Sequence, residues 1–115
     1  MSKPIVAIMY DFDRTLSTKD MQEFSFIPAL NMSSDSFWGD SDAIAKQNKM
    51  DYILATMYLM MKKAREDGVD LSREALKKHG EKVEFYPGVE DWFARVNSYG
   101  EALGLGCGTT SFPAA

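Results

Sequence analysis

The sequence predicts a mostly helical chain with one or two short strands. Apolar residues recur at helical spacing in three stretches, within 20–27, 42–67 and 89–99. The clearest strand signal is the apolar run PIVAIMY at 4–10, which is followed directly by a polar, turn-like segment at 11–19. Such an unbroken apolar run is typical of a strand covered on both faces, as in a parallel sheet.

Composition excludes several classes of protein. The chain has 115 residues, enough for one modest domain, and its net charge is -4 with no basic tract, so a nucleic-acid partner is not expected. The apolar run is too short for a signal peptide or a membrane span. The single cysteine, Cys107, cannot form an internal disulfide. We therefore expect a cytoplasmic protein with no membrane partner.

The central part of the chain is expected to be helical between recognisable ends. A first helix begins near Asp20 and ends at Pro28. Residues 31–41 are rich in Ser, Asp and Gly and predict a loop or a short helix. The strongest helical pattern runs over 42–67, and Gly68 is a suitable stop.

Two shorter helices follow. Ser72 is expected to cap a helix over 73–79, closed by Gly80. A brief extended piece at 83–86 precedes an amphipathic helix that begins near Val89 and runs to Tyr99 or a little beyond. The Gly-rich tail after this helix is expected to be disordered.

Two carboxylates, Asp11 and Asp13, come directly after the predicted strand. At the carboxyl end of a parallel strand such side chains point into the crevice where α/β proteins bind ligands. One aspartate can attack phosphorus to form an aspartyl-phosphate, and the other can protonate the leaving alcohol and later activate water. Thr15 can hydrogen-bond locally and hold the turn. The clustered negative charge calls for a cation, and Mg²⁺ takes oxygen ligands of this kind.

The strand and the motif DFDRTL at 11–16 together resemble the first motif of the haloacid-dehalogenase-like superfamily. By this resemblance Asp11 is the nucleophile and a Mg²⁺ ligand. Asp13 is the general acid/base and offers its backbone carbonyl to the metal. The resemblance implies an α/β fold, with a Rossmann-like core and a helical cap, and hydrolysis of a small phosphorylated metabolite. The alternative is a simple turn or helix-capping pair, and the order of strand, motif and later return segment favours catalysis.

The branch similar to phosphoserine phosphatase inserts a helical cap after this motif. In that branch the chain then returns from the cap to the core. The segment YPGVEDWF at 86–93 is similar to the segment in which this return occurs. The implied organisation is a first core strand and nucleophile loop at 1–16, a helical cap at 17–85, a first core helix at 86–104, and an aberrant tail at 105–115.

The resemblance also requires parts that these 115 residues do not supply. It needs a Ser or Thr after a second strand, a Lys or Arg that neutralises the transferring group, and a later acidic pair. The expectation is therefore an N-terminal fragment that is inactive alone. Codons for 107–115 can be chosen so that one restored base gives VRHYIISGG, an apolar strand followed by Ser. This motivates the hypothesis of a frameshift near Gly106.

Two other functions and several residues remain open. The chain could be a small helical interaction module without catalysis, or the non-functional product of a damaged gene, and its unpaired strand could mediate self-association. His79 is interpreted as a helix-dipole contact, and Cys107 has no nearby His to activate it. Phe37 and Trp38 suit either a substrate pocket or a cap core. Four methionines could form an adaptable binding surface or pack within the cap or against the core: Met50, Met57, Met60 and Met61.

Overall fold

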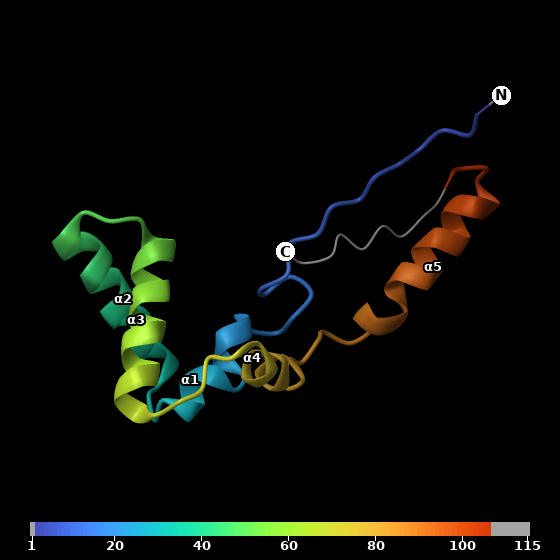
Figure 1. Ribbon diagram of the computed structural model, residues 1–115. Coiled ribbons are helices and arrows are strands. Elements are labelled where there is room, and N and C mark those ends of the chain that lie inside the picture. The colour runs from blue at the N-terminus through green and yellow to red at the C-terminus, as the bar shows by residue number, and fades with distance from the viewer. Residues whose placement is uncertain (1, 107–115) are drawn as a thin grey trace. The chain divides into compact units, whose positions relative to one another are not determined.

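The structure is a computed structural model that describes residues 2–106. This part of the chain is mostly helical, as predicted (Figure 1). It divides into two compact units, and each is described by itself. The helical unit is Lys19–Glu84, and the terminal unit comprises residues 2–18 and 85–106. The tail at 107–115, with Cys107, lies outside the described residues.

The helical unit contains a short 3-10 helix and four α-helices. In chain order they are η1 (Met21–Glu23), α1 (Phe26–Ala29), α2 (Ser34–Asn48), α3 (Tyr52–Asp67) and α4 (Arg73–Gly80). The helices α2 and α3 form a hairpin and lie side by side (Figure 1).

The helix α2 begins earlier than the sequence predicted. Residues 34–41 were expected as a loop or short helix, but they belong to a helix that continues to Asn48. The side chain of Ser33 accepts a hydrogen bond from the backbone N–H of Ser36, which satisfies one of the free donors at the helix start. The Ser-rich composition that predicted a loop therefore supplies the cap of the helix.

The prediction of a single helix over 42–67 is wrong, because the chain turns between α2 and α3. Lys49 adopts a left-handed conformation with φ of 49° and ends α2. Asp51 then caps α3, its carboxylate accepting from the N–H groups of Ile53 and Leu54. An aspartate inside an apolar helical pattern marks a new helix start here, since its side chain competes for backbone donors.

Pro28 does not end a helix as predicted, because it lies inside α1. The helix begins at Phe26, so Pro28 is in its first turn. A proline is tolerated there because its missing N–H would have no partner within the helix.

The prediction for α4 is confirmed at its N-terminus. The hydroxyl of Ser72 accepts from the N–H of Ala75 at 3.2 Å and caps the helix. Gly80 is the last helical residue, and the helix is capped at Glu81.

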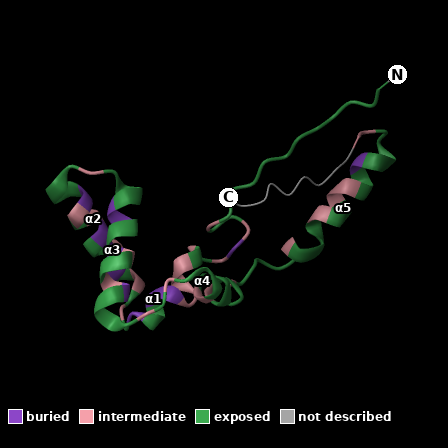
Figure 2. Ribbon diagram, in the orientation of Figure 1, coloured by how far each residue is buried: buried purple, intermediate pink, exposed green. Residues whose placement is uncertain are grey.

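The core of the helical unit is apolar and built from several helices. It comprises Phe26, Ile27, Leu30, Phe37, Leu59 and Ala64. Phe37 is fully buried, and Trp38 packs against the core while its indole N–H donates to Glu23 Oε1 at 3.1 Å. These contacts favour the cap-core interpretation of both aromatic residues. Figure 2 shows buried residues on α2 and α3 alternating with exposed ones.

In the terminal unit the helix α5 (Val89–Ala102) leads the chain back toward the N-terminal segment. After α5 the backbone turns at Gly104, whose φ is 79°, and the N–H of Leu105 donates to the carbonyl of Gly100. Gly106 then forms a parallel bridge with Ile5, and its N–H donates to the carbonyl of Pro4 at 2.9 Å.

The predicted strand at 4–10 is not a regular strand among the described residues. It contributes one isolated bridge, and a second bridge joins Ser17 to Phe85. The expected coverage on both faces is also wrong, since Ile5 and Met9 are 85% and 94% exposed. A covered strand needs neighbours in the sheet, and the described residues supply a single bridge to this segment.

Within the described residues, every helix is too short or too polar to cross a bilayer.

Candidate functional site

The segment that carries the two aspartates is a compact turn held by one carbonyl group. The carbonyl oxygen of Phe12 accepts from the N–H groups of Thr15, Leu16 and Ser17, at 3.2, 3.0 and 3.1 Å. It also accepts from the hydroxyl of Ser17 at 3.2 Å. Arg14 has a φ of 58°, a left-handed conformation that lets the chain reverse within this turn. We call residues 11–17 the motif turn.

The two carboxylates occupy different environments in the motif turn. Asp11 is exposed at the end of the extended segment, and its Oδ2 accepts a long hydrogen bond of 3.4 Å from the hydroxyl of Thr15. Asp13 is half-buried inside the turn. Thr15 therefore orients Asp11 locally, and the exposed Asp11 carboxylate is accessible to a ligand in solution.

The motif turn is fixed to the segment where the chain returns from the helical unit. Ser17, which is fully buried, forms an antiparallel bridge with Phe85, and the N–H of Tyr86 donates to the carbonyl of Leu16 at 3.0 Å. The rings of Phe12 and Phe85 meet edge to face at 6.0 Å. Sequence reasoning named the return segment but missed Ser17 and Phe85, because nothing local to either residue reveals a partner so far along the chain.

The helix α5 is attached to the end of the extended segment by aromatic contacts. The indole N–H of Trp92 donates to the hydroxyl of Tyr10 at 2.8 Å, and the rings of Tyr10 and Phe93 meet edge to face at 5.5 Å. Tyr10 directly precedes Asp11, so these contacts help to place the nucleophile candidate.

The donor set of the motif turn is compatible with Mg²⁺ but small. The carboxylate of Asp11 and the backbone carbonyl of Asp13 are hard oxygen donors, which Mg²⁺ prefers, and this ion commonly binds through one or two carboxylates plus waters and substrate phosphate. Across residues 2–106, no three His, Cys, Asp or Glu side chains gather as a metal-binding group. A complete site at these two residues thus needs further oxygen ligands.

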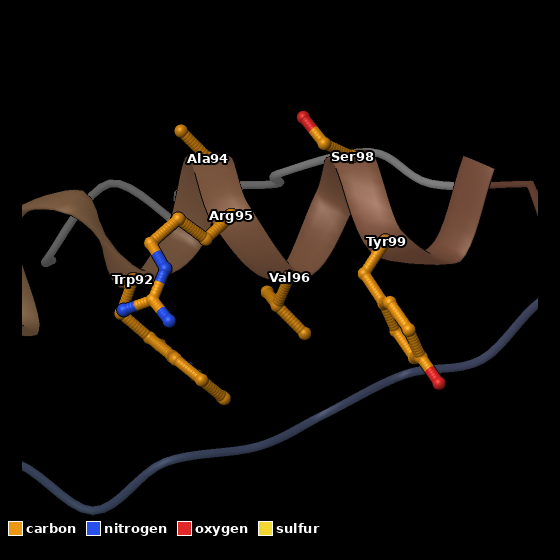
Figure 3. A pocket seen from close by; sticks show the side chains of 6 residues that line it. All are labelled: Trp92, Ala94, Arg95, Val96, Ser98 and Tyr99. Carbon is orange, nitrogen blue, oxygen red and sulfur yellow. The ribbon is translucent and has the colours of Figure 1, made fainter. Parts of the chain in front are cut away.

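A shallow groove lies elsewhere in the terminal unit, along α5. Figure 3 shows Trp92, Val96 and Tyr99 pointing to one side of the helix and Ala94 and Ser98 to the other. Arg95 completes the lining. Neither carboxylate of the motif turn belongs to this groove, so it is not the predicted phosphate site.

In the helical unit, His79 contacts a serine that sequence reasoning did not pair with it. The Nδ1 atom of His79 lies 2.7 Å from the hydroxyl of Ser25, and its ring meets Phe26 edge to face. A catalytic serine also needs a group that orients the histidine and donors for the developing charge. Among the described residues, the contacts of His79 include no such carboxylate. The pair instead joins the last turn of α4 to the start of α1.

No family model, no curated protein and no solved structure matches this chain.

Proposed function

We propose that this chain carries the nucleophile half of a Mg²⁺-dependent phosphomonoester hydrolase of the haloacid-dehalogenase-like superfamily and is inactive alone. The observation that carries the proposal is the motif turn: Asp11 lies exposed at the end of an extended apolar segment, and Asp13 is two residues further on. The same segment bridges in parallel to Gly106 after α5. Parallel pairing across a helical connection is the βαβ arrangement of α/β folds.

The chemistry proposed for the two aspartates is the one that the family resemblance implies. An oxygen of Asp11 attacks phosphorus, the bond from phosphorus to the substrate alkoxide breaks, and Asp13 gives its proton to that alkoxide. Asp13 then takes a proton from water, which attacks the aspartyl-phosphate, releases inorganic phosphate and regenerates Asp11. Mg²⁺ held by Asp11 and the carbonyl of Asp13 would neutralise charge on the phosphoryl group. The substrate class is a small phosphorylated metabolite.

The helical unit corresponds in this proposal to the cap. The chain leaves the terminal unit after residue 18 and returns at residue 85, close to the borders expected for a cap insertion. The Ser17–Phe85 bridge joins these two crossings. An insertion with adjacent ends can fold as a unit without disturbing the core into which it is inserted.

The test compares the chain with a version extended in the alternative reading frame after Gly106. The 115-residue chain should release no phosphate from an aryl phosphate with Mg²⁺, because each missing electrostatic group costs about 10²–10³ in rate. The extended chain should release phosphate, and Asp11→Asn should abolish that activity. An extended, folded chain that is inactive with Mg²⁺ would count against the proposal. Turnover by the 115-residue chain that Asp11→Asn abolishes would refute its inactivity alone.

A helical interaction module without catalysis is the second candidate, favoured by the separate apolar core of the helical unit. The two candidates differ in what Asp11→Asn does. An interaction module would lose nothing with this substitution, whereas the hydrolase would lose its turnover in the extended chain. A non-functional gene product would show neither activity nor a specific partner.

A further inference from the structure

One face of α3 is apolar and exposed, opposite the face that packs against α2. Its members recur at helical spacing and are Ile53, Leu54, Met57, Tyr58 and Met61, between 52% and 68% exposed. We call them the outer stripe of α3. The opposite face carries the buried Ala55, Thr56 and Leu59. Ala64, one turn beyond the stripe, is buried in the core of the helical unit, so the exposed stripe ends at Met61.

From Ile53 to Met61 the helix α3 is therefore apolar on both sides, although the outer stripe is exposed within the helical unit. A helix that is apolar all round is normally buried all round. Tyr and Met, which form part of the outer stripe, are enriched in the cores of protein interfaces. Of the methionines considered above, Met60 packs against the core, whereas Met57 and Met61 are exposed.

The charges beside the outer stripe are arranged by sign along one edge. Residues 51, 58, 62 and 65 follow one another at helical spacing, so Asp51 lies at the N-terminal end of this edge and Lys62 and Arg65 at its C-terminal end. Glu66, the neighbouring acid, forms an ion pair with Lys63 at 3.3 Å. In the part of the chain that the structure describes, Lys62 and Arg65 form no ion pair.

This arrangement is self-complementary for two antiparallel copies. A twofold axis perpendicular to the two helices places the same edge of each copy together, with opposite directions. Asp51 of one copy then faces Arg65 and Lys62 of the other, and symmetry repeats the pairing. Parallel packing would instead place Asp51 against Asp51 and Arg65 against Arg65. Met57 and Tyr58 lie at the middle of the stripe, next to the axis.

We propose that the outer stripe of α3 is a homodimer interface in which two copies pack antiparallel through Met57 and Tyr58. The occupant of the stripe is a second copy of this chain, because the charge pattern complements itself. One helix face per subunit is a small interface, so the dimer is weak and depends on concentration. The dimer requires neither aspartate of the motif turn.

Sedimentation equilibrium of the full chain tests the interface over about a hundredfold range of concentration, which moves a weak equilibrium from monomer to dimer. Met57→Glu places two carboxylates near the axis and should weaken dimerisation at least about tenfold. Leu76→Glu, at an exposed apolar position on α4, is the matched control and should leave it unchanged. A monomer at every concentration, or a dimer that Met57→Glu leaves intact, overturns the proposal.

A charge exchange tests the antiparallel direction. Arg65→Glu alone should weaken the homodimer about threefold to tenfold, because two exposed pairs become repulsive. A chain with Asp51→Lys should likewise self-associate poorly, and mixing the two variants should restore dimers as heterodimers. Circular dichroism checks that Asp51→Lys, which removes a helix cap, remains folded. If Arg65→Glu does not weaken the dimer, the antiparallel arrangement is wrong, and this result does not depend on the folding of the second variant.

Discussion

At the residue scale, a buried hydroxyl pair joins α2 to α3. The hydroxyls of Ser41 and Thr56 are 2.6 Å apart, and that of Thr56 also donates to the carbonyl of Tyr52. No local sequence pattern around either residue predicts this contact. Ser41 was expected in a loop or short helix and Thr56 in a separate long helix, so their contact depends on the hairpin of α2 and α3.

We predict that this hydroxyl pair is coupled. Ser41→Ala should lower the free energy of unfolding by about 1 kcal/mol, the usual net value of a hydrogen bond. Thr56→Val should cost about 1–3 kcal/mol because it leaves the buried Ser41 hydroxyl without this partner. Together the two substitutions should cost less than the sum of the single effects, as measured by urea unfolding. Strict additivity would show that the hydroxyls do not interact.

A second residue-scale prediction concerns Phe37, which is fully buried in the core. Phe37→Ala should cost about 3–5 kcal/mol, through lost burial and the cavity left behind. Leu76→Ala, at an exposed position on α4, should change stability by about 0.5 kcal/mol or less. Equal effects of the two truncations would show that Phe37 does not belong to a packed core.

Asp70 gives a prediction about pH. The N–H of Ser72 donates to its carboxylate at 2.7 Å and the hydroxyl of Ser72 at 2.8 Å, and these bonds lower the pKa of Asp70. The resulting stabilisation of the turn is present above the pKa of the unfolded chain and is lost as pH falls through the lowered folded pKa. NMR titration should show the Ser72 amide shifting with Asp70. Ser72→Ala removes the hydroxyl bond and keeps the backbone bond, so the pKa of Asp70 should rise only in part, and an unchanged pKa would contradict the contribution assigned to the hydroxyl.

At the scale of elements, the sequence could predict features that depend on neighbouring residues, but not contacts between residues far apart in the chain. Ser72 and the helix it caps were predictable because a cap depends on neighbouring residues alone. The cap at Ser33 was hidden in a Ser-rich stretch that also suits a loop, and the turn at Lys49–Asp51 lay inside an apolar pattern. The contacts of Ser17 with Phe85, and of Ser25 with His79, depend on tertiary structure, which no local pattern contains.

The motif turn shows the same division at the candidate site. The positions of Asp11, Asp13 and Thr15 after an apolar run were readable from the sequence. A local hydrogen bond from Thr15 was expected, and the structure gives Asp11 as its partner. The role of the Phe12 carbonyl as common acceptor was not readable, because it depends on a left-handed Arg14. Arg14 has no sequence feature that favours such a conformation, which glycine or asparagine adopts more readily.

Hydrogen exchange should separate the helices from the extended segment. We predict protection of the amides in α3, whose inner face is buried, and little protection in residues 5–10, which are largely exposed. The experiment belongs at a concentration where the chain is a verified monomer. Strong protection of residues 5–10 in that monomer would show that the segment has found backbone partners beyond its bridge at Ile5.

At the scale of the whole molecule, the helical unit should be the more independent of the two units. Its core residues all lie within Lys19–Glu84, and its helices depend largely on local contacts. A polypeptide of residues 19–84 should therefore keep helical circular dichroism and a cooperative thermal transition. Unfolding of this polypeptide while the full chain stays folded would show that the terminal unit is needed for its stability.

In the terminal unit, by contrast, the extended apolar segment is held by one isolated parallel bridge among the described residues. This segment ends in the motif turn, and the chain comes back parallel to it at Gly106. A parallel strand normally has neighbours and cover on both faces, and here the apolar side chains of Ile5 and Met9 are exposed. In the proposed hydrolase, further strands would cover this segment.

The nucleotide sequence beyond the codon of Gly106 tests this account most directly. Read in the alternative frame, it should continue as an apolar strand that ends in Ser, followed further on by a Lys and then an acidic pair. These are the groups that a phosphoryl-transfer site built on Asp11 and Asp13 still needs. A downstream sequence that encodes no such strand, Lys and acidic pair in any frame would contradict the assignment of the motif turn to a phosphohydrolase core.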